Sequence, residues 1–136
     1  MIPRRDALAL GLLLSASAAS AAPAAGTRLW ELTYLKSLDP DPGALVRFIE
    51  RNWFAMDAEA VRQGLMTGYT LLQGEDPDWN LICAVGYPDP AGYAGIADRF
   101  EAIRKVHRTV LVDGKSLKEL GRITGSRKLL PVAGQA

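Results

Sequence analysis

Two side chains in this 136-residue sequence are candidates for proton-transfer chemistry, His107 and Glu31. A neutral imidazole can act as a base or ligate haem iron, and His107 is the single histidine of the chain. Glu31 lies in an alternating segment, where a carboxylate that faces a cavity can have a raised pKa and act as an acid or base. Each also has a structural interpretation. His107 can be a locally bonded residue near a helix end, and Glu31 can pair across strands with Arg122 or Arg127.

A second group of residues can bind a ligand rather than transform it. Tyr34, Tyr69 and Trp79 lie in expected strands, where aromatic rings can line a pocket for an apolar ring. Arg122 lies in the last expected strand and is a further candidate, while the cluster Arg104, Lys105 and Arg108 can bind an anion or form a solvated helix end. The alternative for the aromatic residues is simple burial in the core, which is common for such residues in strands. We take Tyr34, Tyr69, Trp79 and Arg122 as candidate ligand-binding residues.

Several kinds of site are excluded by composition. One histidine and one cysteine cannot supply the three or four close ligands that a zinc site needs. The sequence has no dinucleotide-binding glycine motif after a strand, no phosphate-binding P-loop and no GxSxG motif. No metal or cofactor is therefore predicted, with haem on His107 as the alternative. Cys83 cannot pair within its own chain and is expected to be a small buried side chain in a strand.

The N-terminal segment has the layout of an export signal. Arg4 and Arg5 precede an apolar run over residues 7–14, and Ala19-Ser20-Ala21 fits a cleavage site after Ala21. Residues 1–21 are therefore predicted to be a signal peptide, of twin-arginine or Sec type, and residues 22–27 a flexible leader. This predicts a periplasmic or secreted protein. Cleavage would remove two of the 16 basic and one of the 15 acidic residues, and the resulting neutral chain is a poor partner for nucleic acid or anionic membranes.

The elements that position the candidates follow from hydrophobic periodicity. Strands are predicted over residues 29–36, 66–73, 79–87 and 121–130, with a loose tail at 131–136. A first helix is predicted from Pro42, capped by Asp41, to about residue 63, and a second over residues 91–112. The apolar stripe of the second helix contains Ile96, Phe100, Ile103 and Val110, and His107 lies on it. A turn at Asp113-Gly114 and a capping box from Ser116 to Glu119 follow.

The order strand, helix, strand, strand, helix, strand predicts an α+β protein of the ferredoxin-like type. Right-handed crossovers give a four-stranded antiparallel sheet in the order 4-1-3-2, with both helices on one face. The third strand has apolar residues on both of its faces, so a monomer would expose an apolar surface to solvent. We therefore expect a homodimer that packs sheet against sheet. We place Glu31 on the sheet face away from the second helix.

Over residues 28–130 the chain resembles the dimeric α/β-barrel superfamily, on the basis of element order, amphipathic helices and the two-sided sheet. The resemblance implies an α/β barrel made by two chains. It also implies binding of a small apolar or aromatic ligand, with cofactor-free monooxygenase-like or isomerase-like chemistry. In the haem-degrading members an iron-ligating histidine lies on the second helix, like His107, but the first strand here lacks their asparagine. A haem-binding protein and a non-catalytic dimerisation module are the alternatives.

Overall fold

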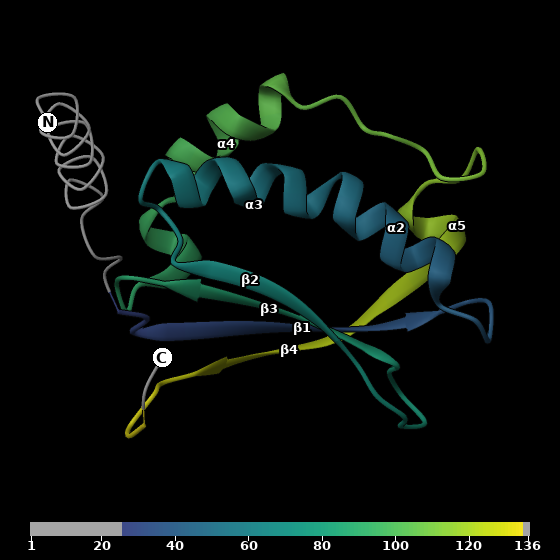
Figure 1. Ribbon diagram of the computed structural model, residues 1–136, viewed down its shortest axis with the longest axis horizontal. Helices are drawn as coiled ribbons and strands as arrows, with labels where there is room; N and C mark the ends of the chain where they lie inside the picture. The colour runs from purple at the N-terminus through teal and green to yellow at the C-terminus, as the bar shows by residue number, and fades with distance from the viewer. Residues whose placement is uncertain (1–25, 135–136) are drawn as a thin grey trace, which may run out of the picture.

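The computed structural model describes residues 26–134 and has the predicted order of main elements (Figure 1). The predicted signal peptide, most of the leader and the last two residues lie outside the described residues. The strands form one antiparallel sheet in the order β2-β3-β1-β4, and this confirms the predicted ferredoxin-like topology. The elements are β1 (Leu29–Ser37), α2 (Gly43–Arg51), α3 (Trp53–Arg62), β2 (Gly68–Gln73), β3 (Leu81–Tyr87), the 3₁₀ helix η1 (Gly92–Gly95), α4 (Ala97–Val106), α5 (Leu117–Leu120) and β4 (Gly121–Leu129).

The helices lie on one side of the sheet, and the opposite face carries no helix within the described chain (Figure 1). Alternation along the strands decides which side chains face the helices. Leu29 and Leu35 of β1 are buried beneath the helices, opposite Tyr87 and Leu81 of β3. Their neighbours in the sequence therefore point to the open face.

The first predicted helix is interrupted at Asn52, which separates α2 from α3. The backbone of Asn52 departs from helical values, with φ −119° and ψ −69°. Its side-chain amide donates a hydrogen bond of 2.9 Å to the carbonyl of Phe48, one turn earlier. An asparagine that bonds to the preceding turn competes with the backbone ladder, which explains the local distortion.

The prediction of the second helix was wrong at its C-terminal end. This helix begins as η1 and continues as α4, which ends at Val106, so neither His107 nor Val110 lies on it. His107 is extended, with φ −83° and ψ 128°. The side chain of Asn52 explains the early end, because it bonds both backbone groups of Val110, at 2.7 Å to the N–H and 2.9 Å to the carbonyl. These tertiary bonds replace those that a longer helix would make.

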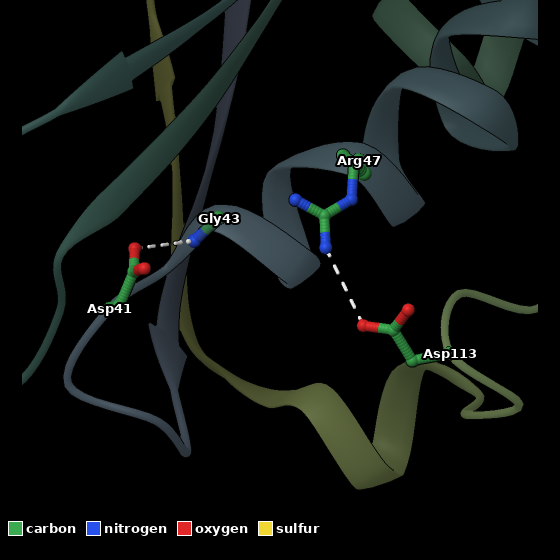
Figure 2. A network of polar contacts seen from close by, with 4 residues as sticks. All are labelled: Asp41, Gly43, Arg47 and Asp113. Atoms are coloured by element: carbon green, nitrogen blue, oxygen red, sulfur yellow. Dashed lines mark hydrogen bonds and ion pairs between the residues drawn. The ribbon is translucent and has the colours of Figure 1, made fainter.

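The predicted helix starts and turns are largely confirmed. The Asp41 carboxylate accepts the backbone N–H of Gly43 at 3.0 Å, but the N-cap of α2 is Pro42, so the predicted cap at Asp41 was wrong by one residue (Figure 2). Asp113 and Gly114 both have positive φ, as a tight two-residue turn requires. Arg47 pairs with Asp113 at 3.5 Å and ties this turn to α2 (Figure 2). The Glu119 carboxylate accepts the N–H of Ser116, as the capping box predicts.

Candidate functional site

A cavity of about 270 Å³ lies between the sheet and helices α3 and α4. Side chains of β1, β3, α3, η1 and α4 border it. The lining is largely apolar and aromatic, with a few polar groups, which is the usual composition of a small-molecule site. The lining residues are Thr33, Trp53, Met56, Asp57, Met66, Cys83, Val85, Tyr87, Tyr93, Phe100 and Arg104.

Asp57 of α3 is the buried ionisable group of this cavity. Its side chain points from α3 toward the sheet, and the residue is only 5% exposed. Burial raises the pKa of its carboxyl from 3.8 to about 7, because water no longer solvates the charged form. Within residues 26–134 no charged group or hydrogen bond offsets this effect. Asp57 therefore exchanges a proton near neutral pH, which is the property required of a general acid or base.

Glu31 faces the helices, not the open face of the sheet as we expected. Its Oε2 accepts the backbone N–H of Tyr93 at 3.2 Å. Burial raises the pKa of the neighbouring Tyr87, and the charge of Glu31 adds to this effect. The alternating pattern of β1 correctly predicted which side chains share a face of the sheet. It could not indicate which of the two faces the helices cover. Lys128 lies opposite Glu31 in the sheet, so neither Arg122 nor Arg127 is its cross-strand neighbour.

Because Gly92 has no side chain, Glu31 can approach η1 closely and hold this segment at the border of the cavity. Its φ is +61°, and a Cβ atom at this position would lie 2.5 Å from both Glu31 Oε2 and the side chain of Leu29. Only glycine tolerates such a close approach in this conformation. Glu31 and Gly92 together fix η1 against β1, and Tyr93 of η1 then lines the cavity.

Arg104 brings a positive charge to the cavity lining. Its guanidinium lies 5.5 Å from the centre of the Phe100 ring, and its side chain is 52% exposed. A hydrogen bond to Tyr93 is the main cause of a raised pKa for Arg104. Tyr93 in turn packs edge-on against Phe100, with ring centres 5.7 Å apart. The Nε of Arg104 also lies 3.3 Å from a carboxylate oxygen of Glu101, so Arg104 is held by an ion pair and by Tyr93 while it remains partly open to solvent.

Cys83 is buried in β3, as the sequence predicts. Burial, with a smaller contribution from Asp57, raises the pKa of its thiol to about 12. A thiol that stays protonated is a poor nucleophile. Cys83 thus contributes shape to the cavity wall and not reactivity.

His107 lies outside this cavity and belongs to a structural network. Its Nε2 lies 2.9 Å from Oδ1 of Asn52, so the imidazole donates to that oxygen. His107 also borders a separate groove between α3 and α4, of about 410 Å³. The two catalytic candidates from the sequence are therefore not brought together.

The four candidate ligand-binding residues are dispersed. Tyr34 and Trp79 meet edge-on at 5.8 Å and line a shallow pocket on the side away from the helices. Tyr69 is on the helix-covered side, where its ring contacts that of Phe54 of α3 at a tilt of 46°, with ring centres 4.7 Å apart. Arg122 is exposed on β4 opposite Lys36. They do not form a common site.

The described part of the chain contains no group of three or more side chains suited to holding a metal ion. Among residues 26–134, no helix has the length and apolar character needed to cross a membrane.

Comparison with known proteins agrees with the fold. The structure is similar to that of PA3566 from Pseudomonas aeruginosa, with a TM-score of 0.50 at 14% identity over 80% of this chain and 98% of that one. The chain has the ferredoxin-like fold. A dimeric ferredoxin-like protein of unknown function from Bacteroides fragilis matches with a TM-score of 0.45 and 12% identity, over 75% of this chain and 94% of that one. No family model and no curated protein sequence matches the chain.

Asp57 is the residue that the sequence interpretation missed. It follows Trp53 by four positions and precedes Ala60 by three, so it lies on the helix face that packs on the sheet. The sequence could have indicated this residue, because Asp57 is a carboxylate at a position where the helical periodicity predicts a buried side chain.

Proposed function

We propose that this protein binds a small apolar or aromatic molecule in the cavity between the sheet and helices α3 and α4. The observation that carries the proposal is a lone buried carboxyl group, Asp57, in a cavity otherwise lined mainly by apolar and aromatic side chains. Such a group destabilises the fold, so its presence is better explained by a ligand than by packing. The chemistry is cofactor-free and of the isomerase type.

In this proposal Asp57 replaces the two catalytic candidates from the sequence. Glu31 binds the backbone of Tyr93 and acts as a positioning residue. His107 is bonded to Asn52 and does not line the cavity. Asp57 makes no such structural hydrogen bond within the described residues, and it lines the cavity directly.

The working unit in this proposal is a homodimer formed through the open face of the sheet. Trp30, Leu32 and Tyr34 of β1 alternate with the buried residues and therefore point to that face, where Ile82 of β3 is the neighbour of Tyr34. Leu72 on the adjacent strand is 50% exposed. A surface of this kind is typical of a protein interface, and a second copy supplies a matching one. We further propose that the dimer acts after export, on the strength of the signal-like N-terminal sequence.

Calorimetric titration with 1-naphthol tests the ligand site. We expect saturable binding that is lost in Val85→Phe, because Val85 lines the cavity and a larger side chain fills it. Leu38→Phe is the control, since Leu38 is 52% exposed and is not among the cavity-lining residues. Equal binding by wild type and Val85→Phe would place the ligand elsewhere.

A further inference from the structure

We propose that the ligand is an enolisable carbonyl compound and that Asp57 transfers the proton in its keto–enol tautomerisation. This inference rests on the proposed ligand site and adds a substrate class and a reaction to it. The geometry behind it is one cavity that contains a carboxyl group without a partner, two tyrosines and an arginine.

The surroundings of Asp57 leave it free to react with a ligand. The titratable groups of the packed elements are Cys83 and Tyr87 of β3, Tyr93 of η1, Arg104 of α4 and Glu31 of β1, next to Tyr87. None of them is bonded to the Asp57 carboxyl within the described residues. The protein therefore contains a proton acceptor whose own hydrogen-bonding capacity is available to the ligand.

Arg104 indicates the charge of the bound species. A cationic ligand would be attracted to the aromatic rings and to Asp57, but Arg104 already lies over Phe100 and bonds to Tyr93. A second cation in the same cavity would be repelled by the guanidinium. A neutral ligand on which negative charge develops during reaction is favoured instead. The Nε of Arg104 pairs with Glu101, but the other N–H groups of its guanidinium can donate hydrogen bonds to the resulting oxygen anion.

The reaction follows from these two groups. The Asp57 carboxylate removes a proton from the carbon next to the carbonyl, and the C–H electron pair forms a carbon–carbon double bond. The electrons of the C=O double bond move to the oxygen, and Arg104 stabilises the resulting enolate. The protonated Asp57 then returns the proton to the enolate oxygen, which gives the enol and regenerates the carboxylate. No oxidant or reductant is consumed.

Hydrogen–deuterium exchange of 2-indanone in D₂O, followed by proton NMR, tests this reaction. We expect wild-type protein to accelerate loss of the signal of the protons next to the carbonyl, with a rate that rises with pH through the titration of Asp57. Asp57→Asn keeps the side-chain shape but cannot accept the proton, and it should lose at least about 100-fold of the acceleration. Asp98→Asn, which removes an exposed carboxylate of α4, should behave like wild type.

Calorimetry with the same ketone separates the two proposals. Binding of 2-indanone without accelerated exchange, or equal exchange by wild type and Asp57→Asn, would overturn the inference and leave the ligand site standing. If neither 2-indanone nor 1-naphthol binds, the proposed function itself is refuted. Circular dichroism of each variant verifies that its fold is retained.

Discussion

The imidazole of His107 and the amide of Asn52 are joined by a contact of 2.9 Å between Nε2 and Oδ1. The same amide oxygen accepts the N–H of Val110 at 2.7 Å, and the amide nitrogen donates to Phe48 and Val110. One buried side chain thus ties the junction of α2 and α3 to the segment that follows α4. This network, and not an apolar helix stripe, holds His107 in place.

Asn52→Ala should lower the free energy of unfolding by about 2 kcal/mol, because it removes the side-chain hydrogen bonds that join Asn52 to Phe48, His107 and Val110. Urea unfolding followed by circular dichroism measures this loss. Gln63→Ala is the control, since Gln63 is exposed and the change should stay within about 0.5 kcal/mol. A loss no larger than that of the control would show that the network contributes little.

Haem titration should give no Soret band that depends on His107, because Nε2 is already bonded to Asn52. Absorbance spectra of wild type and His107→Ala with added haem test this expectation. A Soret band in wild type that disappears in the variant would establish the haem alternative instead.

Asp57→Asn should remove a pH dependence of stability. The carboxyl has a pKa of about 7 in the folded protein and 3.8 as the ordinary value, so folding favours the protonated form. Its contribution is fully present below about pH 4, falls as the pH rises toward 7 and is then lost. The difference in pKa corresponds to about 4 kcal/mol.

Thermal unfolding from pH 4 to pH 8 measures this effect. Wild type should lose stability relative to Asp57→Asn over that range, and Asp98→Asn should follow wild type. Parallel curves for wild type and Asp57→Asn would mean that Asp57 is ionised in the folded protein with little cost.

Gly92→Ala should destabilise the fold by about 2 kcal/mol or more, because a Cβ atom would strain a positive φ and collide with Glu31. Gly68→Ala is the matched control, since no atom lies within 4 Å of its added Cβ. Urea unfolding compares the two. A similar effect of both variants would contradict the close packing of Gly92 on β1.

Ile82→Lys should convert the proposed dimer to a monomer, because a charge in the centre of an apolar interface has no partner. Sedimentation velocity measures the oligomeric state. Leu111→Lys places the same charge on a residue that is 52% exposed in the segment after α4, and it should leave the dimer intact. A monomeric wild type would refute the dimer directly.

The strands could be predicted because alternation is a local property of the sequence, and their order followed from the element order and right-handed crossovers. The same alternation could not assign faces, since both sides of β1 carry apolar residues, and Glu31 was therefore placed on the wrong side. The end of α4 could not be predicted either. It depends on Asn52, which lies 58 residues before Val110 in the sequence.

The candidate site was predicted only in part. The two-layer fold implied a space beside the sheet, but the sequence did not identify Asp57, because a charged residue on an amphipathic helix is ordinarily assigned to the exposed side. Its burial results from the neighbouring bulk of Trp53 and Met56 and from the strand beneath. Such a placement emerges only when all three elements are assembled.

The junction between α2 and α3 also offers a way to recognise distant homologues. At 14% identity, the similarity to PA3566 shows the fold alone. An asparagine within a long helix, matched by a histidine directly after α4 and any residue other than proline three positions later, forms a pattern that can be sought in unaligned sequences. Proteins that preserve this trio would be expected to share the early end of α4, and those that lack it could extend the helix over the groove.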